Sequence, residues 1–207
     1  NKNIIDTTGQ FLGRALTPKE RGYGQEDKGQ FGESGYIFAA CGAAPVYRRK
    51  MLEDIKIGGE VFDSGFNAFF EDFDMGWRAR MLGWEAYYVS GAVGWHVRGG
   101  STDVGNAAGF LGKYKFPKKS SLTKKRIYVN YASAIYKNCP AGLLLIQLPF
   151  IALRHLLLSA YLLFTSPALL AANFDIIKNM KVLSQSRKYI QGRKTVSAND
   201  LRKWILK

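Results

Sequence analysis

Residues 69–84, FFEDFDMGWRARMLGW, contain the best-defined helix signal of the chain. Acidic side chains crowd the start of this stretch, and Arg78 and Arg80 occupy what would be its last turn. Both placements suit a helix, whose N-terminus attracts negative charge and whose C-terminus attracts positive charge. Asp74 and Arg78 lie four residues apart and can pair across one turn on the helix surface. We therefore predict a helix from Glu71 to about residue 81.

The apolar residues of this stretch give the predicted helix a buried face. Phe73, Trp77 and Met81 recur every four residues and form one stripe, and Gly83 supplies a C-terminal stop. Short apolar runs flank the helix at residues 36–41, 84–90 and 92–97, and each predicts a strand. A further helix is expected over residues 46–55, with Pro45 as its first residue.

Charge divides the 207-residue chain into two unlike halves. Residues 1–104 carry 12 Lys and Arg side chains against 14 Asp and Glu, whereas residues 105–207 carry 18 against two. The net charge of +14 therefore belongs to the second half, which suggests that the two halves face different surroundings. The cysteines, Cys41 and Cys139, lie far apart in sequence, and we expect two reduced thiols in a cytosolic setting.

A long apolar segment covers residues 141–172 within the basic half. It is long enough to span a bilayer, but prolines interrupt it and Arg154 lies near its middle. Gln147, Arg154 and Tyr161 recur every seven residues as a narrow polar stripe. Helices lying in the membrane interface, flanked by Lys and Arg, fit this pattern better than a simple span. A buried helical hairpin and an oligomer interface are the alternatives.

Three segments together resemble the inverting glycosyltransferase family 2, which has the GT-A fold. They are FAACGAAPVYRR (residues 38–49), the stretch at 69–84 with its E-D-x-D-x-x-W-R motif, and VGWHVRGGS (residues 93–101). The nearest match is to bacterial enzymes that build rhamnose-containing and other surface polysaccharides. The resemblance implies transfer of a sugar from a UDP- or dTDP-sugar to a hydroxyl of a lipid-linked glycan. It also implies a place at the cytoplasmic face of the bacterial inner membrane.

The resemblance assigns Asp72 as the catalytic base. An inverting transferase needs one carboxylate to take the proton of the attacking acceptor hydroxyl. From the residues alone, Asp72 is equally well explained as a helix cap, since Asp is a favoured capping residue. Glu71 beside it would shape the acceptor pocket or raise the pKa of Asp72 by like-charge repulsion.

Four further residues are assigned to the site. His96 would complete the site of a divalent metal, Mg²⁺ or Mn²⁺, that holds the leaving diphosphate, although a lone His is often structural. Arg98 would contact the substrate from a Gly-rich loop. Gly42 would let the backbone approach donor sugar or acceptor, or else mark a strand bulge. Trp77 would line the acceptor pocket or belong to the core.

The family pattern also predicts what this chain lacks. No D-x-D metal motif of the kind that the family places upstream precedes Cys41. We therefore expect an α/β fold comprising the acceptor-side half of a GT-A Rossmann-like mixed sheet, followed by a mainly helical, membrane-associated region. The segments would be a loop-rich part at 1–35, the catalytic half-domain at 36–112 and the basic helical region at 113–207.

The competing hypothesis is an inactive membrane-binding or adaptor module derived from a glycosyltransferase. Nucleic acid is not an expected partner. The Lys and Arg residues of the second half alternate with long aliphatic runs, whereas nucleic-acid surfaces favour exposed aromatic side chains and polar grooves.

Overall fold

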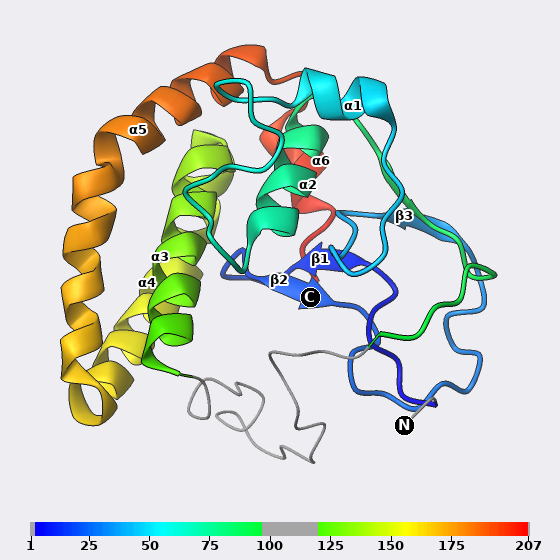
Figure 1. Cartoon of the computed structure of the whole chain (residues 1–207), viewed down its shortest axis with the longest axis horizontal. Coiled ribbons are helices and arrows are strands. Elements are labelled where there is room, and N and C mark those ends of the chain that lie inside the picture. Colours follow the sequence, from blue (N-terminus) through cyan, green and yellow to red (C-terminus); the bar gives the residue numbers. More distant parts are fainter. Residues whose placement is uncertain (1–2, 97–119, 207) are drawn as a thin grey trace.

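Short strands and helices occupy the first half of the chain, and long helices occupy the second (Figure 1). The computed structural model describes residues 3–96 and 120–206. The first half contains β1 (Gln10–Leu12), β2 (Pro18–Glu20), β3 (Gly35–Ile37), α1 (Arg49–Asp54), α2 (Glu71–Met81) and β4 (Ala86–Tyr88). The second half contains α3 (Ser121–Asn138), α4 (Ala141–Thr165), the 3-10 helix η1 (Pro167–Ala171), α5 (Ala172–Arg193) and α6 (Ala198–Arg202).

The strands form two small antiparallel sheets. In one, β1 pairs with β2 and Gln10 lies opposite Glu20; in the other, β3 pairs with β4. The chain is thus mixed α/β with a helical C-terminal region, as predicted. The predicted strands are shorter than the apolar runs suggested, and residues 92–96, where a strand was expected, form none. The side chains of Val93 and Trp95 are largely exposed there, so no neighbouring surface favours strand pairing.

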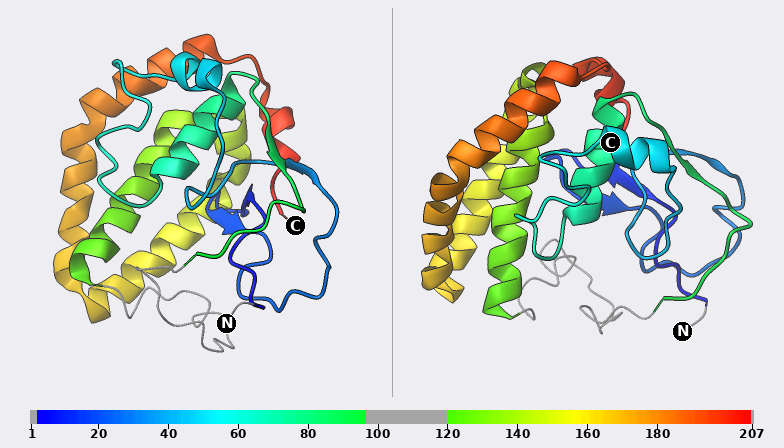
Figure 2. Two further views of the ribbon diagram at one scale, coloured as in Figure 1. Left: turned by 45° about the vertical axis from the view of Figure 1, so that its right-hand side comes forward. Right: turned by 45° about the horizontal axis from the view of Figure 1, so that its top comes forward.

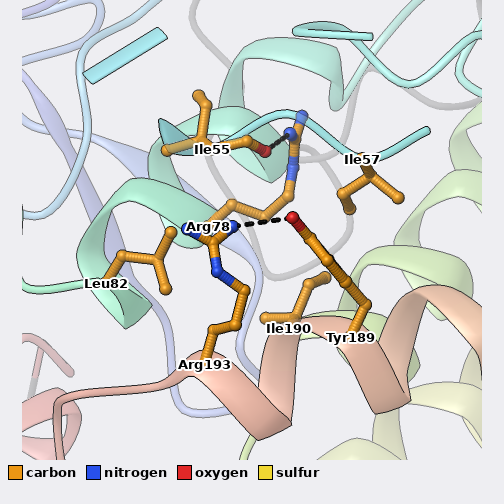
Figure 3. Close-up of a pocket in the computed structure, with 7 residues that line it drawn as sticks. All are labelled: Ile55, Ile57, Arg78, Leu82, Tyr189, Ile190 and Arg193. Carbon is orange, nitrogen blue, oxygen red and sulfur yellow. Dashed lines mark hydrogen bonds between the residues drawn. The ribbon is translucent and has the colours of Figure 1, made fainter. Parts of the chain in front are cut away.

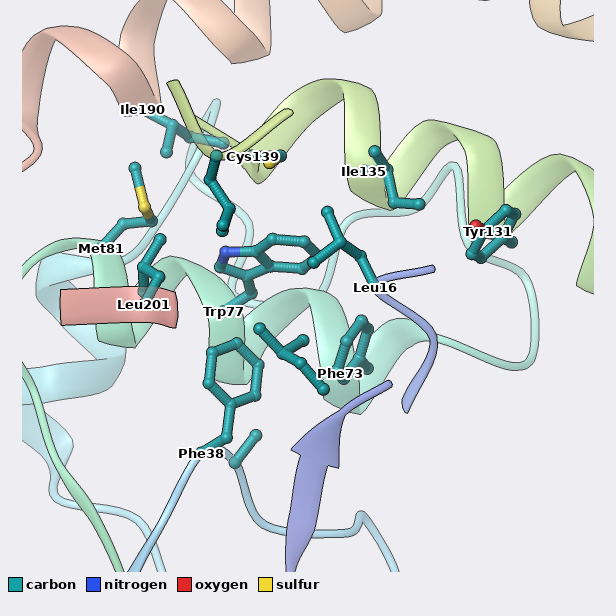
Figure 4. Close-up of a cluster of buried hydrophobic side chains, with 13 residues drawn as sticks. Leu16, Phe38, Phe73, Trp77, Met81, Tyr131, Ile135, Cys139, Ile190 and Leu201 are labelled. Atoms are coloured by element: carbon teal, nitrogen blue, oxygen red, sulfur yellow. The ribbon is translucent and has the colours of Figure 1, made fainter. Parts of the chain in front are cut away.

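The predicted helix at the centre of the sequence is confirmed as α2. Its stripe residues Phe73, Trp77 and Met81 are buried, and Gly83 ends the helix with a φ of 82°. Figure 4 shows the indole of Trp77 in the middle of the core, between α2 and α3. Residues from both halves of the chain line this core, which includes Leu12, Phe38, Phe73, Tyr131, Cys139, Ile190 and Leu201.

The C-terminal segment closes the core beside β1. The Leu12 amide donates to the Trp204 carbonyl at 3.0 Å, and the Leu206 amide donates to the Leu12 carbonyl at 2.8 Å. The two halves therefore share one core. The expected boundary at residues 112–113 lies outside the described residues. Neither Cys41 nor Cys139 forms a disulfide bond among the described residues.

The Asp74–Arg78 pair forms as predicted but lies in the interior. Arg78 Nε donates to Asp74 Oδ2 at 2.9 Å, and neither side chain is more than 2% exposed. The predicted surface location was wrong because Lys137 of α3 covers this face of α2 and contacts Asp74 Oδ1 at 2.8 Å. Arg78 also donates to the carbonyls of Ile55 and Val61, so its charge is fully hydrogen-bonded.

One helix boundary differs from the sequence prediction. Helix α1 begins at Arg49 and excludes Pro45, because residue 48 is extended and Val46 is fully exposed with nothing to pack against. Helix α3 begins at Ser121, where the Ser120 side chain accepts from the Thr123 amide. Helix α6 begins after Ser197, which forms a capping box with Asp200.

Helix α4 is continuous from Ala141 to Thr165, so the predicted interruption at Pro149 was wrong. Pro149 removes one intrahelical hydrogen bond, which the helix tolerates, whereas the residue before Pro167 leaves the helical region and ends α4. Among the described residues, α4 is the one helix long and apolar enough to cross a membrane, and only 11% of its apolar window is buried. Its polar side chains point inward: Gln147 is 6% exposed, and His155 Nε2 lies 3.0 Å from the Tyr128 hydroxyl.

Candidate functional site

The carboxylate of Asp72 is held in one orientation at the start of α2. Its Oδ2 accepts from the Gly42 amide at 2.7 Å and from Gln10 Nε2 at 3.1 Å, and its Oδ1 accepts from the Phe73 amide at 2.7 Å. The residue at the N-cap position is Phe70, so simple N-capping does not explain Asp72. Asp72 remains partly exposed, and its carboxylate is therefore both fixed and accessible to a substrate.

The strand pair β1–β2 contacts this carboxylate through Gln10. Gln10 is 3% exposed, and its Nε2 atom also donates to Glu20 Oε1 at 3.0 Å, so one amide group bridges two carboxylates. The Thr7 hydroxyl donates to the second carboxylate oxygen of Glu20. Figure 1 shows the N-terminal end of α2 facing these two strands. No sequence pattern predicted a role for Gln10, because no motif includes it and 62 residues separate it from Asp72.

Gly42 approaches Asp72 closely. A Cβ atom at this position would lie 3.1 Å from the Asp72 Cβ and 3.4 Å from its Oδ2. A side chain here would push the carboxylate aside, because such a contact is tighter than ordinary van der Waals distance. The absence of a side chain therefore lets the Gly42 amide reach Asp72. The sequence prediction of a close backbone approach to substrate stays a prediction.

The backbone leading into α2 adopts an uncommon conformation. Phe69 and Phe70 have φ values of 67° and 72°, in the left-handed region that bulky residues rarely occupy. Each such residue costs about 1–3 kcal/mol, so surrounding contacts must hold it. Asn130 of α3 supplies them, since its Nδ2 donates to the carbonyls of Ala68 and Phe69 at 2.9 and 2.8 Å. Such strain tends to accumulate at functional sites.

Two ionisable side chains lie in the partly desolvated surroundings of Asp72. Burial raises the pKa of Glu71; a backbone hydrogen bond opposes this effect, and the Asp72 charge adds to it. Burial also raises the pKa of Tyr47, with a further contribution from Asp72. Glu71 Oε2 and the Tyr47 hydroxyl are buried and have no hydrogen-bond partner among the described residues. Water is thus largely excluded on this side of Asp72.

His96 pairs with a carboxylate near the N-terminus. Its Nδ1 lies 3.1 Å from Asp6 Oδ2, and Asp6 precedes Thr7, which bonds to Glu20. A chain of contacts therefore links His96 to the Asp72 site. Residues 3–96 and 120–206 contain no group of three or more His, Cys, Asp or Glu side chains placed to hold a metal. Arg98, the other predicted substrate contact in this region, lies outside the described residues.

The structure corrects the assignment of Trp77 as a substrate contact. Trp77 is 0% exposed and packs edge-to-face against Phe38 and Phe73 (Figure 4). A side chain without exposed surface cannot touch an acceptor. Trp77 instead fixes α2, and with it Asp72, against the core.

Two cavities lie away from Asp72. The first, between α1, α2 and α5, is lined by Ile55, Arg78 and Arg193 and holds about 10 Å³, the space of one water molecule (Figure 3). The second holds about 160 Å³ between Arg80, Asp200 and Trp204. Neither includes Asp72.

No family model, curated protein or solved structure matches the chain. The arrangement at Asp72 must therefore be interpreted from its own chemistry. A fixed, partly exposed carboxylate beside a desolvated patch can accept a proton from a bound hydroxyl group.

Proposed function

We propose that the chain carries the acceptor side of an inverting glycosyltransferase of family 2, with Asp72 as the general base. The observation that carries the proposal is the Asp72 carboxylate, held by the Gly42 amide and Gln10 while still accessible. The remaining lone pairs of this carboxylate take the proton of the acceptor hydroxyl as its oxygen attacks the anomeric carbon. The bond to the nucleoside diphosphate breaks with its electron pair, and the diphosphate leaves.

The fixed orientation of Asp72 explains how the site would accelerate this step. A base within hydrogen-bond reach of its proton, in a constant geometry, turns an encounter in solution into an intramolecular transfer. The three donors on Asp72 supply that geometry, and the strained backbone at Phe69 and Phe70, held by Asn130, sets the direction of α2. Glu71 lies beside the base, where it would bound the acceptor pocket.

The donor side of the reaction forms a second part of the proposal. In the GT-A fold a D-x-D strand–helix half binds the sugar nucleotide, and residues 1–40 carry no D-x-D motif. Mg²⁺ or Mn²⁺ would neutralise the leaving diphosphate, with His96 and Asp6 as its protein ligands on this side. Two side chains suffice for such an ion when phosphate oxygens and water complete its coordination.

Membrane association is the third part of the proposal. The outward face of α4 is apolar, with Leu145, Leu156 and Phe164 at 71%, 67% and 85% exposure. The views of Figure 2 show α4 in the group of long helices with α3 and α5, and His155 and Arg154 of α4 contact Tyr128 and Tyr131 of α3. This face would lie in the cytoplasmic interface of the bacterial inner membrane, where lipid-linked glycans present their sugars. The basic second half would attract anionic lipid.

A single substitution tests the catalytic part. Asp72→Asn in the natural protein is expected to abolish release of nucleoside diphosphate in the presence of acceptor, because the amide cannot take up the proton. The variant also loses one of the three hydrogen bonds, since Asn offers one oxygen where Asp offers two. Glu33→Gln, an exposed carboxylate away from the site, is the matched control and should retain full turnover.

The same measurement separates the enzyme from the adaptor module. Undiminished turnover by Asp72→Asn would refute Asp72 as the base. Vesicle binding by the natural protein, without turnover of any UDP- or dTDP-sugar, would favour the adaptor, which the exposed apolar face of α4 also supports.

A further inference from the structure

An arginine without an acceptor lies in the middle of the apolar helix α4. The guanidinium carbon of Arg154 lies 4.0 Å from the centroid of the Tyr131 ring. Its Nε and Nη1 atoms are buried and have no hydrogen-bond partner, and Arg154 forms no ion pair with a carboxylate of the described residues. Withdrawing these donors from water without an acceptor is unfavourable. Among residues 3–96 and 120–206, no group accepts a hydrogen bond from these two nitrogen atoms.

A second cation, Arg14, lies next to the first. The guanidinium carbon of Arg14 lies 5.7 Å from the centroid of the Phe150 ring, and Phe150 precedes Arg154 by one turn of α4. The Tyr131 hydroxyl donates to the carbonyl of Ala15, the neighbour of Arg14, at 2.6 Å. Arg14 thus contacts α4 at Phe150, and Tyr131, on which Arg154 stacks, is hydrogen-bonded to the residue next to Arg14. Arg14 and Arg154 therefore each contact an aromatic ring where α4 and α3 meet the segment that follows β1.

We propose that Arg14 and Arg154 bind the phosphate or diphosphate of a long-chain lipid, which is the anchor of the glycan acceptor. Two planar guanidinium groups suit the paired oxygens of a phosphate, and such charge-assisted bonds are strong. The exposed side chains of Leu153 and Leu157, next to Arg154 along α4, offer an apolar surface for the hydrocarbon chain. This inference rests on the proposed function, because it names the acceptor class of the Asp72 site.

The phosphate site connects directly to the base. The ring of Tyr131, on which Arg154 stacks, lies 6.2 Å from the ring of Phe70 between centroids. Phe70 is the N-cap of α2, two residues before Asp72. A sugar attached to a phosphate at Arg154 would therefore extend past Tyr131 and Phe70 toward the carboxylate. Helix α4 would thus hold the enzyme at the membrane and also orient the lipid-linked acceptor toward Asp72.

Vesicle binding tests the site without any need for turnover. The natural protein and its variants Arg154→Gln and Arg14→Gln are sedimented with neutral phosphatidylcholine vesicles that contain a small fraction of polyprenyl phosphate. Parallel vesicles contain the same molar charge as phosphatidylglycerol. Arg154→Gln should weaken binding to the polyprenyl phosphate vesicles about tenfold or more, the effect of losing hydrogen bonds to a charged group. Arg49→Gln, an exposed arginine on α1, should bind like the natural protein.

The arms of the experiment distinguish the sources of the phosphate. A preference for polyprenyl phosphate over phosphatidylglycerol that both Arg variants lose supports the proposal. Effects of the two substitutions that fall short of additivity, measured with the double variant, support one shared ligand. Either equal loss on both kinds of vesicle or unchanged binding by Arg154→Gln would overturn it.

The Asp72→Asn variant keeps this test independent of the catalytic proposal. Asp72→Asn should bind polyprenyl phosphate vesicles normally and release no nucleoside diphosphate. If it retains turnover, the assignment of Asp72 fails while the binding result stands. If Asp72→Asn lacks turnover and Arg154→Gln binds normally, the assignment of the phosphate site is wrong and the assignment of Asp72 is retained.

Discussion

Removing the charge of Asp74 tests how α2 is anchored to the C-terminal helices. Asp74 is 0% exposed and accepts hydrogen bonds from Arg78 Nε at 2.9 Å and from Asn138 Nδ2 at 2.7 Å. Its Oδ1 also lies 2.8 Å from Lys137 Nζ. Lys137 pairs in addition with Asp63, so two cations face two carboxylates. Asp74→Asn leaves the group with one uncompensated positive charge in the interior.

The expected effect is large compared with the stability of a typical domain. Breaking a buried ion pair by removing one partner costs about 3–5 kcal/mol, because the remaining charge stays desolvated. The total free energy of unfolding of a typical domain is about 5–15 kcal/mol. Lys137→Met should cost a similar amount, since it leaves the opposite charge uncompensated. The double variant restores neutrality and should be more stable than the sum of the two losses implies.

Urea unfolding followed by tryptophan fluorescence measures these losses, with the buried Trp77 as a reporter on the same helix. The pH dependence provides a second signature. Burial alone would raise the pKa of Asp74, but Lys137 and Arg78 together hold it below its usual value. Its contribution is therefore present above the unfolded carboxyl pKa of about 3.9 and is lost as the pH falls through the lower folded pKa. The difference in free energy of unfolding between the natural protein and Asp74→Asn should therefore disappear in acid.

If the free energy of unfolding of Asp74→Asn lies within about 1 kcal/mol of that of the natural protein at neutral pH, Asp74 does not anchor α2 in this way, because a broken buried pair costs far more. Strict additivity in the double variant would lead to the same conclusion. Either outcome would mean that water or relaxation already compensates these charges.

Two further substitutions test the support of Asp72. Asn130→Ala leaves the Ala68 and Phe69 carbonyls without their donor and should lower the free energy of unfolding by about 1–3 kcal/mol in urea; no change would show that the left-handed backbone needs no support from α3. Gly42→Ala places a Cβ 3.1 Å from the Asp72 Cβ and should lower kcat about tenfold or more, with stability nearly unchanged, because small displacements of a catalytic group are costly. Unaltered turnover by Gly42→Ala would contradict the assigned geometry.

The parts of the fold that the sequence predicted well are those specified by local signals. Helix α2 has its acidic start, its apolar stripe and its glycine stop within one continuous stretch, so each signal acts on neighbouring residues. Strand lengths were predicted poorly because pairing depends on distant partners. Gly35 pairs with Tyr88, for example, and no local pattern in either run indicates where the pairing ends.

The same distinction applies to the candidate site. Asp72 was predicted because it belongs to a short motif. Gln10 and Asn130 were not, since each reaches its partner across about sixty residues of sequence and is an unremarkable polar residue locally. Asp74 shows the intermediate case: its partner four residues away was predicted, whereas its contact with Lys137 and its burial depend on α3.

Helix α4 shows why a periodic pattern alone does not say which face is inside. The seven-residue recurrence of Gln147, Arg154 and Tyr161 defines a polar stripe, and in water that stripe would face out. Here Gln147 is buried and Arg154 stacks on Tyr131, while leucines face outward. Burying a leucine side chain stabilises a fold by about 1.5–3 kcal/mol. The stabilisation that several exposed leucines would provide if buried is therefore comparable to the total free energy of unfolding of a domain. This reversed arrangement is favourable where lipid covers the outer face, and on the proposed function it would place Arg14 and Arg154 at the edge of that lipid.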